Sequence, residues 1–422
     1  MAQPPLPLAG EIRAWPAART RLSPAAERRR YGLVAVVWAG WLVAMLGVVV
    51  VGVETGLISD PASRWTHFGG PLWPLFTWDY AWYERVASVG YPHGADSPLY
   101  AFFPLWPWLL RASGSVADWI VAFGSVIAAS ALAFAGVTAA APSARAWRSA
   151  AVLACWPGSF MLLLAYPDVI ALAAAAWAAA FALRGRPWLA GLCGAVAAVA
   201  RPTGFLIAIA LLFVARGSRP ARIFAAAAPV AAAAAVHAFF WERSGDPRAF
   251  LHAQALPIWN RNGPARFKHW PGHVAHALHA HALVVGVGGL VAAALVLLAA
   301  RRLGRWHALV VAYLFVVSAL LLGAQTTQTR IESALLAGVV PLLGLLWRLG
   351  VRYRPWALYA TAVVAVSFFS GTVTSFARQA LFAFPLYWAV ANGPRQLRHP
   401  AVAALGVAAN LAFALTIAKY AP

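Results

Sequence analysis

Long apolar runs separated by short polar stretches cover the chain from residue 32 to its C-terminus. Such runs form helices in a bilayer, because lipid offers no partner to backbone polar groups. The runs lack the two-residue alternation that is typical of transmembrane β-strands. The pattern therefore predicts an all-α polytopic membrane protein with a bundle of about thirteen hydrophobic helices. The predicted segments are 32–53, 116–140, 149–165, 168–184, 187–200, 203–215, 221–241, 281–300, 307–323, 333–347, 356–369, 380–392 and 400–418.

Two of these segments, 187–200 and 203–215, are too short to cross a bilayer. A helix of about 14 residues rises about 21 Å, whereas the hydrocarbon core is about 30 Å thick. We expect the pair to enter the membrane and return, with Arg201-Pro202-Thr203-Gly204 as the turn at its tip. Full spanning by both segments is the alternative, and either arrangement leaves the sidedness of the other segments unchanged.

Charged residues set the expected orientation. A basic tail, 1–31, carries Arg19, Arg21, Arg28, Arg29 and Arg30 before an apolar run that is too long for a cleavable signal peptide. With this tail in the cytoplasm, the short inner loops hold arginine and no acid, as the positive-inside rule predicts for basic residues. Every acid beyond the tail then falls outside. Residues 32–422 form one membrane domain, and its long outer loops, 54–115 and 242–280, form the expected working face.

The composition argues against a nucleic-acid-binding function. The net charge of +21, from 33 basic and 12 acidic residues, would suggest a nucleic-acid partner in a soluble protein. Here 62% of residues are hydrophobic and the mean hydropathy is +0.71. Arginine at helix ends explains the charge, so we expect a lipid bilayer as partner and no nucleic acid. Cys155 and Cys193 lie in apolar segments and carry no redox information.

Asp79 is the most informative acid, because it lies among aromatic rings in the first outer loop. If the chain after it is helical, Tyr83 follows on the same face one turn later. At the helix start the positive end of the dipole keeps its carboxylate ionised, which suits a general base that takes a proton from a sugar hydroxyl. The alternatives are an N-cap for Asp79 and an interfacial aromatic belt for the rings.

The motif Trp78-Asp79-x-x-x-Tyr83-x-x-x-Ala87-x-x-Gly90-Tyr91, followed by Ala101-Phe102-Phe103-Pro104-Leu105-Trp106-Pro107, resembles the signature of PIG-V-type mannosyltransferases. This is the GPI mannosyltransferase 2 family with its bacterial relatives, in the GT-C superfamily. Further similar motifs follow in order along nearly the whole chain. They are Trp156-Pro157-Gly158-Ser159-Phe160, Tyr166-Pro167-Asp168, Ala200-Arg201-Pro202-Thr203-Gly204, Gly245-Asp246-Pro247 with Phe250 and Trp259, Ser375-Phe376-Ala377-Arg378, and Phe384-Pro385. Two positions depart from the family pattern, which usually has Tyr-Ser-Glu at 166–168 and often a tyrosine at Gln379.

The resemblance implies a GT-C-type bundle that transfers a sugar, usually mannose, from a polyprenyl-phosphate carrier to an acceptor on the outer face. The acceptor would be a glycolipid, a glycan or a protein. A β-linked donor and an α-linked product imply inversion in one displacement, with Asp79 as the base. The expected substrate-binding residues are Trp78, Trp82, Tyr83, Tyr91, Tyr166, Asp168, Arg201 and Arg378.

The arginines have a stated task in this scheme, because the leaving lipid phosphate needs cations. Arg201 lies at the tip of a buried pair and Arg378 at the outer mouth of the next-to-last helix. Their alternatives are capping of helix 187–200 and interfacial snorkelling. Asp168 would orient an acceptor hydroxyl or pair with an arginine, although a helix start favours an acid on dipole grounds alone.

No cofactor is firmly predicted beyond the lipid-linked sugar donor, and a divalent-metal site is the less favoured alternative. His273, His276 and His279 share one broad helical face of the second outer loop, but no acid or cysteine joins them. Another carrier-linked sugar, a pentose or glucose, is an alternative donor. A transporter or flippase for a lipid-linked sugar is the alternative of another class. The short inner loops and the absence of N-glycosylation sequons favour a bacterial plasma membrane.

Overall fold

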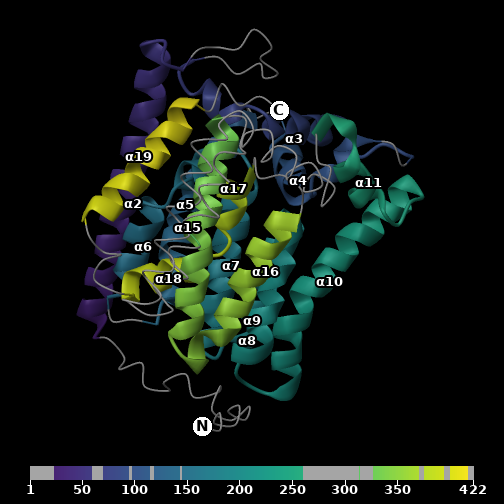
Figure 1. Ribbon diagram of the computed structural model, residues 1–422. Helices are drawn as coiled ribbons and strands as arrows, with labels where there is room; N and C mark the ends of the chain where they lie inside the picture. Colours follow the sequence, from purple (N-terminus) through teal and green to yellow (C-terminus); the bar gives the residue numbers. More distant parts are fainter. Residues whose placement is uncertain are drawn as a thin grey trace, which may run out of the picture.

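The computed structural model describes residues 23–58, 70–94, 97–114, 118–142, 145–259, 313, 327–369, 375–393 and 400–416. Within these ranges the chain is helical and contains no strand, as the apolar pattern predicts. Figure 1 shows the helices packed into one bundle, with α2 and α19 side by side at its left and α10 along its right. Helices α3, α4 and α11 gather at one end.

The longer helices are α2 (Pro24–Glu54), α5 (Asp118–Ala140), α7 (Asp168–Leu183), α8 (Pro187–Ala200), α10 (Arg219–Ser244), α15 (Thr327–Arg348), α16 (Arg354–Phe369) and α19 (Pro400–Thr416). The shorter helices are α3 (Asp79–Val89), α4 (Leu105–Ala112), α6 (Trp147–Ala154), α9 (Ile207–Val214), α11 (Ala249–Ala255), α17 (Phe376–Ala380) and α18 (Pro385–Asn392). Short 3₁₀ helices are η1 (Trp73–Phe76), η2 (Pro98–Ala101), η3 (Ser159–Leu163), η4 (Pro202–Leu206), η5 (Pro257–Trp259) and η7 (Val351–Tyr353).

Three helices in the described part are long and apolar enough to cross a membrane. They are Pro24–Glu54, Trp119–Ala140 and Arg219–Ser244, and several shorter apolar helices accompany them. These segments indicate a membrane protein. Of the thirteen expected segments, 281–300 lies outside the described residues, and so does 307–323 apart from residue 313.

Helix α7 forms the centre of the bundle. It packs between α5 and α8, and α10 covers the other side of α8. The α7 sequence is rich in alanine, and most of its residues are buried. Small side chains allow helix axes to approach closely, which is how apolar helices gain packing energy in a membrane. The apolar run therefore predicts the element correctly, and its alanines explain its central place.

The expected continuous segment 149–165 is wrong in detail, because the structure breaks it into α6 and η3. Gly158 adopts φ of +89° at the break. The freed backbone groups are paired by Asn410 of α19, whose Nδ2 donates to the Trp156 carbonyl at 2.8 Å and whose Oδ1 accepts from the Phe160 N–H at 3.1 Å. Pro157 and Gly158 disfavour a continuous helix at this point, and a buried amide from a distant helix pairs the backbone groups that the break leaves.

The pair 187–200 and 203–215 folds back on itself as α8, η4 and α9. The two ends of this hairpin lie close together. A Cβ built on Gly217, just after α9, would lie 3.1 Å from the ring of Pro187, the first residue of α8. At the tip, a Cβ on Gly204 would lie only 1.9 Å from the Ala197 carbonyl oxygen, so only glycine allows the chain to turn this tightly. The hairpin carries Arg201 at its tip, which is where the sequence places it.

Candidate active site

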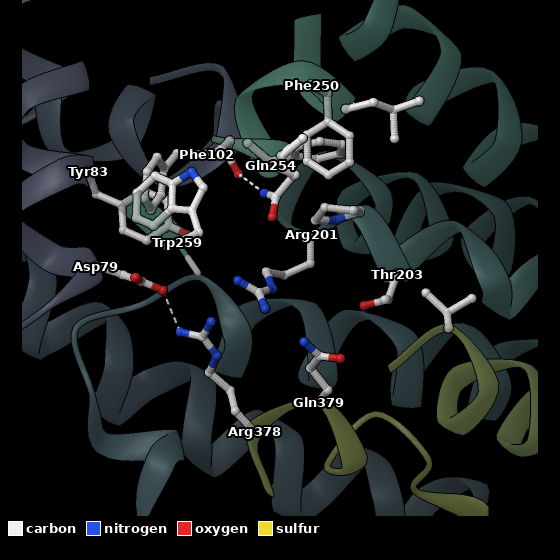
Figure 2. Close-up of a pocket in the computed structure, with 16 residues that line it drawn as sticks. Asp79, Tyr83, Phe102, Arg201, Thr203, Phe250, Gln254, Trp259, Arg378 and Gln379 are labelled. Carbon is white, nitrogen blue, oxygen red and sulfur yellow. Dashed lines mark hydrogen bonds and ion pairs between the residues drawn. The ribbon is translucent and has the colours of Figure 1, made fainter. Parts of the chain in front are cut away.

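A cavity of about 680 Å³ lies where α3, η4, α11 and α17 approach one another. This size is within the roughly 300–1,000 Å³ that is usual for small-molecule sites. Figure 2 shows its lining, with the Arg201 and Arg378 side chains directed inward from different walls. The lining residues are Asp79, Tyr83, Ala101, Phe102, Phe103, Arg201, Pro202, Thr203, Phe250, Leu251, Gln254, Ala255, Trp259, Val366, Arg378 and Gln379.

Asp79 is the first residue of α3, as the sequence predicts. The N-cap alternative does not describe it, because Trp78 holds the N-cap position and makes no side-chain capping bond. Tyr83, one turn further along the helix, lines the same cavity. Asp79 and Tyr83 therefore share one helix face, which is the arrangement that the four-residue spacing predicts.

The Asp79 carboxylate is already bound to an arginine. Its Oδ2 accepts a hydrogen bond of 2.5 Å from Nη1 of Arg378. The Asp79 side chain is 22% exposed, so it still reaches the cavity, whereas Arg378 is 10% exposed. An ion pair this short and this sheltered from water is a strong charge-assisted hydrogen bond. The sequence predicts both residues for the site but does not predict their pairing.

Asp168 forms a second, deeper charge contact behind the cavity wall. Its Oδ1 lies 3.3 Å from Nη2 of Arg201 and 3.8 Å from Nε of Arg378. Only 1% of the Asp168 side chain is exposed, so it does not line the cavity. Pairing with an arginine was one of its two expected roles. Asp79, Asp168, Arg201 and Arg378 thus form a cluster with two positive and two negative formal charges.

Several polar atoms of this charge cluster remain without a hydrogen bond. Among the described residues, four of its atoms have no partner that meets hydrogen-bond geometry. They are both carboxylate oxygens of Asp168, Nε of Arg201 and Nε of Arg378. Buried polar groups are normally satisfied, so each exception calls for an explanation. The cluster therefore has unused hydrogen-bonding capacity next to a cavity large enough for a ligand.

The opposite side of the cavity is aromatic and apolar. Phe102 and Trp259 meet edge to face at 5.6 Å, and Trp82 stacks on Phe102 at 6.0 Å with an interplanar angle of 13°. The phenol ring of Tyr83 also packs on Phe102, and burial raises the pKa of Tyr83 well above its ordinary value. Because the Tyr83 phenol stays protonated, it can donate a hydrogen bond but cannot serve as a base near neutral pH.

Helix α11 closes one side of the cavity. Nε2 of Gln254 donates to the carbonyl of Ala101 at 3.1 Å, which ties α11 to η2. Asp246 holds the turn before the helix, because its Oδ1 accepts from the N–H of Arg248 at 2.8 Å and its Oδ2 lies 2.7 Å from Nδ1 of His252. The N–H of Arg248 and, less strongly, His252 lower the pKa of Asp246. Asp246 is thus a turn residue.

The remaining predicted substrate-binding residues do not line the cavity. Trp78 precedes Asp79, and Trp82 lies behind Phe102. Tyr91 is buried, and its hydroxyl donates to the Phe102 carbonyl at 2.6 Å. Tyr166 is fully buried, and its hydroxyl contacts the backbone beside Asp79. These residues support the walls of the cavity.

Sequence reasoning missed Gln254 and Glu332 as contributors. Gln254 lies among the mostly apolar residues of α11, so only its polarity in that context could have indicated it. Glu332 is buried in α15, and its Oε2 accepts from the N–H of Ala377 at 2.5 Å, next to Arg378. No local motif marks that contact, because 45 residues separate its partners.

Within the described ranges, no group of three or more His, Cys, Asp or Glu side chains is arranged to hold a metal ion. The histidine cluster that contains His273, His276 and His279 lies outside the described residues.

Comparisons with known proteins found no match to a family model, to a curated protein or to a solved structure.

Proposed function

We propose that this protein is an integral membrane glycosyltransferase of the GT-C type, similar to PIG-V-type mannosyltransferases. It transfers a sugar, most simply mannose, from a polyprenyl-phosphate carrier to an acceptor hydroxyl. The observation that carries the proposal is the composition of one cavity, which is lined by Asp79, by Arg378 paired with it, and by Arg201. A carboxylate can take the proton of a hydroxyl, and guanidinium groups bind phosphate.

The chemistry is a single displacement. Asp79 accepts the proton of the acceptor hydroxyl while the acceptor oxygen attacks the anomeric carbon. The bond from that carbon to the carrier oxygen breaks, and the polyprenyl phosphate leaves with the electron pair. Attack from the face opposite the leaving group inverts the anomeric configuration. Arg201 and Arg378 stabilise the negative charge that develops on the phosphate, which is the type of interaction that contributes most to catalysis.

The Asp79–Arg378 ion pair means that the carrier phosphate also has to compete with Asp79 for Arg378. In the free protein Nη1 of Arg378 binds the base itself, at 2.5 Å. An incoming phosphodiester offers the same guanidinium a competing anion. Transfer of Arg378 from Asp79 to the phosphate releases the carboxylate for the acceptor proton. The base is therefore available only when a donor is bound.

The aromatic side of the cavity fits the rest of the donor. Sugar rings stack on aromatic faces, and Trp259 and Phe102 are the rings that line the cavity near Tyr83. The apolar Phe250, Leu251 and Val366 also belong to the lining and suit the start of an isoprenoid chain. A site with both a charged and an apolar part matches a substrate that is itself a lipid phosphate.

The proposal includes a location. The N-terminus lies in the cytoplasm and the cavity opens to the outer face of a bacterial plasma membrane. The 1–31 tail and the single 32–422 domain follow the sequence prediction, with a GT-C bundle of about thirteen helices. The end of the bundle that carries α3 and α11 belongs to loops 54–115 and 242–280, which the positive-inside rule places outside.

The test is incubation of the purified protein with carrier lipids that bear mannose, glucose or a pentose, followed by mass spectrometry of acceptor lipids from the membrane. We expect a new glycosidic bond with one of them. Asp79→Asn should reduce transfer by a factor of roughly 10²–10⁴, the usual contribution of a general base. Glu54→Gln, at an exposed acid outside the cavity, is the matched control and should retain wild-type turnover.

The panel also separates the alternatives. A pentose or glucose product retains the mechanism and changes the donor. Movement of the lipid-linked sugar across a vesicle membrane with no new glycosidic bond would instead assign the cavity to a transporter or flippase.

A further inference from the structure

We infer that Tyr166 is a positioning residue that sets the orientation of Asp79 through its hydroxyl group. This inference rests on the proposed function for the name of the reaction, but its geometry is independent of that reaction. Tyr166 does not line the cavity, so the sequence expectation of substrate binding does not describe its contacts. Its hydroxyl instead contacts the backbone on both sides of Trp78.

Two hydrogen bonds define this contact. The Tyr166 hydroxyl donates to the carbonyl of Thr77 at 2.7 Å and accepts from the N–H of Asp79 at 3.2 Å. The first N–H groups of a helix have no acceptor within that helix, and Asp79 is the first residue of α3. Since the N-cap residue offers no side-chain acceptor, a phenol 87 residues away supplies it.

The backbone between those two contacts is strained. Trp78 has φ of +55° and is the one non-glycine residue with positive φ in the described part of the chain. A bulky side chain at positive φ is an outlier that costs roughly 1–3 kcal/mol and persists only where neighbouring contacts fix it. The Tyr166 hydroxyl joins the residues before and after Trp78, so it is placed to hold this conformation.

A third contact fixes the phenol itself. The N–H of Ala165 donates to the carbonyl of Leu75 at 2.9 Å, which aligns the two segments next to the hydroxyl. On the other side, the guanidinium carbon of Arg378 lies 5.5 Å from the centre of the Tyr166 ring. The buried Tyr166 side chain thus contacts the backbone of Asp79 through its hydroxyl and carries the Arg378 guanidinium over its ring. Its hydroxyl determines where the Asp79–Arg378 pair can form.

The variant that tests this is Tyr166→Phe, which keeps the ring and removes only the hydroxyl. We expect kcat to fall by a factor of roughly 10–100, because a displacement of about 1 Å at a reacting group can cost 10²-fold. The KM for the lipid-linked sugar should change by less than about threefold, because the cavity lining is untouched. Tyr387→Phe is the matched control, since that buried hydroxyl donates to the Leu381 carbonyl at 2.9 Å and its ring does not line the cavity. Its kcat should remain near the wild-type value.

A rescue separates positioning from simple stability. Glycine adopts positive φ without strain, so Tyr166→Phe should lower kcat less in a Trp78→Gly background than it does in the wild type. The same double variant keeps the experiment possible should Tyr166→Phe fold poorly. Unchanged kcat in Tyr166→Phe, or an equal loss in Tyr387→Phe, would overturn the inference.

An experimental structure of Tyr166→Phe gives a readout that needs no sugar transfer. We expect Trp78 to leave positive φ and Oδ2 of Asp79 to move away from Nη1 of Arg378. A structure with both features in place overturns the positioning role even where the wild-type protein is an active transferase. Conversely, displacement of Asp79 in a protein that transfers no sugar supports the positioning role and refutes the proposed function alone.

Discussion

Oδ2 of Asp79 lies 2.5 Å from Nη1 of Arg378, although 299 residues separate the two in the sequence. This contact joins the start of α3 to the short helix α17 near the end of the chain. In this contact the candidate base, Asp79, is bound to Arg378, which the carrier phosphate would also need as a cation. Competition between two anions for one guanidinium is therefore central to the proposed mechanism.

The first prediction concerns that competition. Asp79→Asn should bind sugar-free polyprenyl phosphate at least about tenfold more tightly than the wild type, because a hydrogen bond to a charged group is worth about 1.5–3 kcal/mol and its competitor is gone. The measurement is binding of the lipid phosphate in detergent by titration. In an Arg378→Gln background the same substitution should change affinity by less than about twofold. Equal gains in both backgrounds would indicate a general charge effect and contradict exchange at Arg378.

The second prediction concerns Asp168. Asp168→Asn leaves the buried guanidinium groups of Arg201 and Arg378 without their shared carboxylate. Removal of one member of a buried ion pair typically costs about 3–5 kcal/mol, so the free energy of unfolding should fall by that order. Thermal unfolding in detergent measures it as a lower Tm. Glu27→Gln is the matched control, because the Glu27 side chain that pairs with Arg30 is 52% exposed. Its effect should be below about 1 kcal/mol.

The third prediction concerns the turn before α11. Asp246→Ala removes the acceptor for the Arg248 N–H and the partner of His252. We expect faster hydrogen exchange over residues 248–255 and a higher KM for the donor, because Phe250 and Gln254 of α11 line the cavity. Asp246→Asn keeps one acceptor oxygen and should show a smaller effect.

The same turn should respond to acid in the wild type. Because the N–H of Arg248 lowers the pKa of Asp246 in the folded protein, the ionised carboxylate stabilises the turn. That contribution is present above the ordinary carboxyl value of 3.8 and is lost as the pH falls through the lowered value in the folded state. Exchange at 248–255, corrected for intrinsic rates, should rise over that acidic range and show no such rise in Asp246→Ala. A wild-type segment that exchanges equally at all these pH values would contradict the assigned role.

The fourth prediction concerns the tip of the α8–α9 hairpin. Gly204→Ala should destabilise the protein by at least about 1–3 kcal/mol, since its Cβ would lie 1.9 Å from the backbone oxygen of Ala197. The strain should displace Arg201, three residues earlier, and weaken binding of polyprenyl phosphate. Gly40→Ala is the matched control, because nothing lies within 4 Å of a Cβ built there in the middle of α2. That variant should keep the wild-type Tm or raise it slightly.

Local sequence patterns predict the helices of this fold well. The apolar runs correspond to α5, α7, α8 and α10 within a few residues, and Arg201 lies at the tip where segment lengths place it. The break at 155–158 has a local signal in Pro157-Gly158, which the length of the apolar run concealed. The pairing of the freed backbone groups by Asn410, about 250 residues away, could not be predicted. Side chains that pair backbone groups from a distance leave no periodic signal near the site they affect.

The residues of the candidate site could likewise be predicted from local sequence, whereas the contacts between them could not. Motifs and the helical repeat identify Asp79, Tyr83, Arg201 and Arg378, and all four line one cavity. The contacts between them are long-range, so the charge pairing and the Tyr166 hydroxyl bridge appear only in three dimensions. The sequence also groups Tyr166 with substrate-binding residues because it adjoins Asp168 in a motif. Proximity in a motif does not tell which side of a cavity wall a ring occupies.

The residues that line the cavity lie far apart in the chain, from Asp79 in α3 to Arg378 and Gln379 in α17. During synthesis on the ribosome, Asp79 and Asp168 are therefore made long before Arg378. A chain that ends ahead of residue 378 holds neither the complete lining nor the ion pair, so it lacks the site at which we propose that the carrier lipid binds.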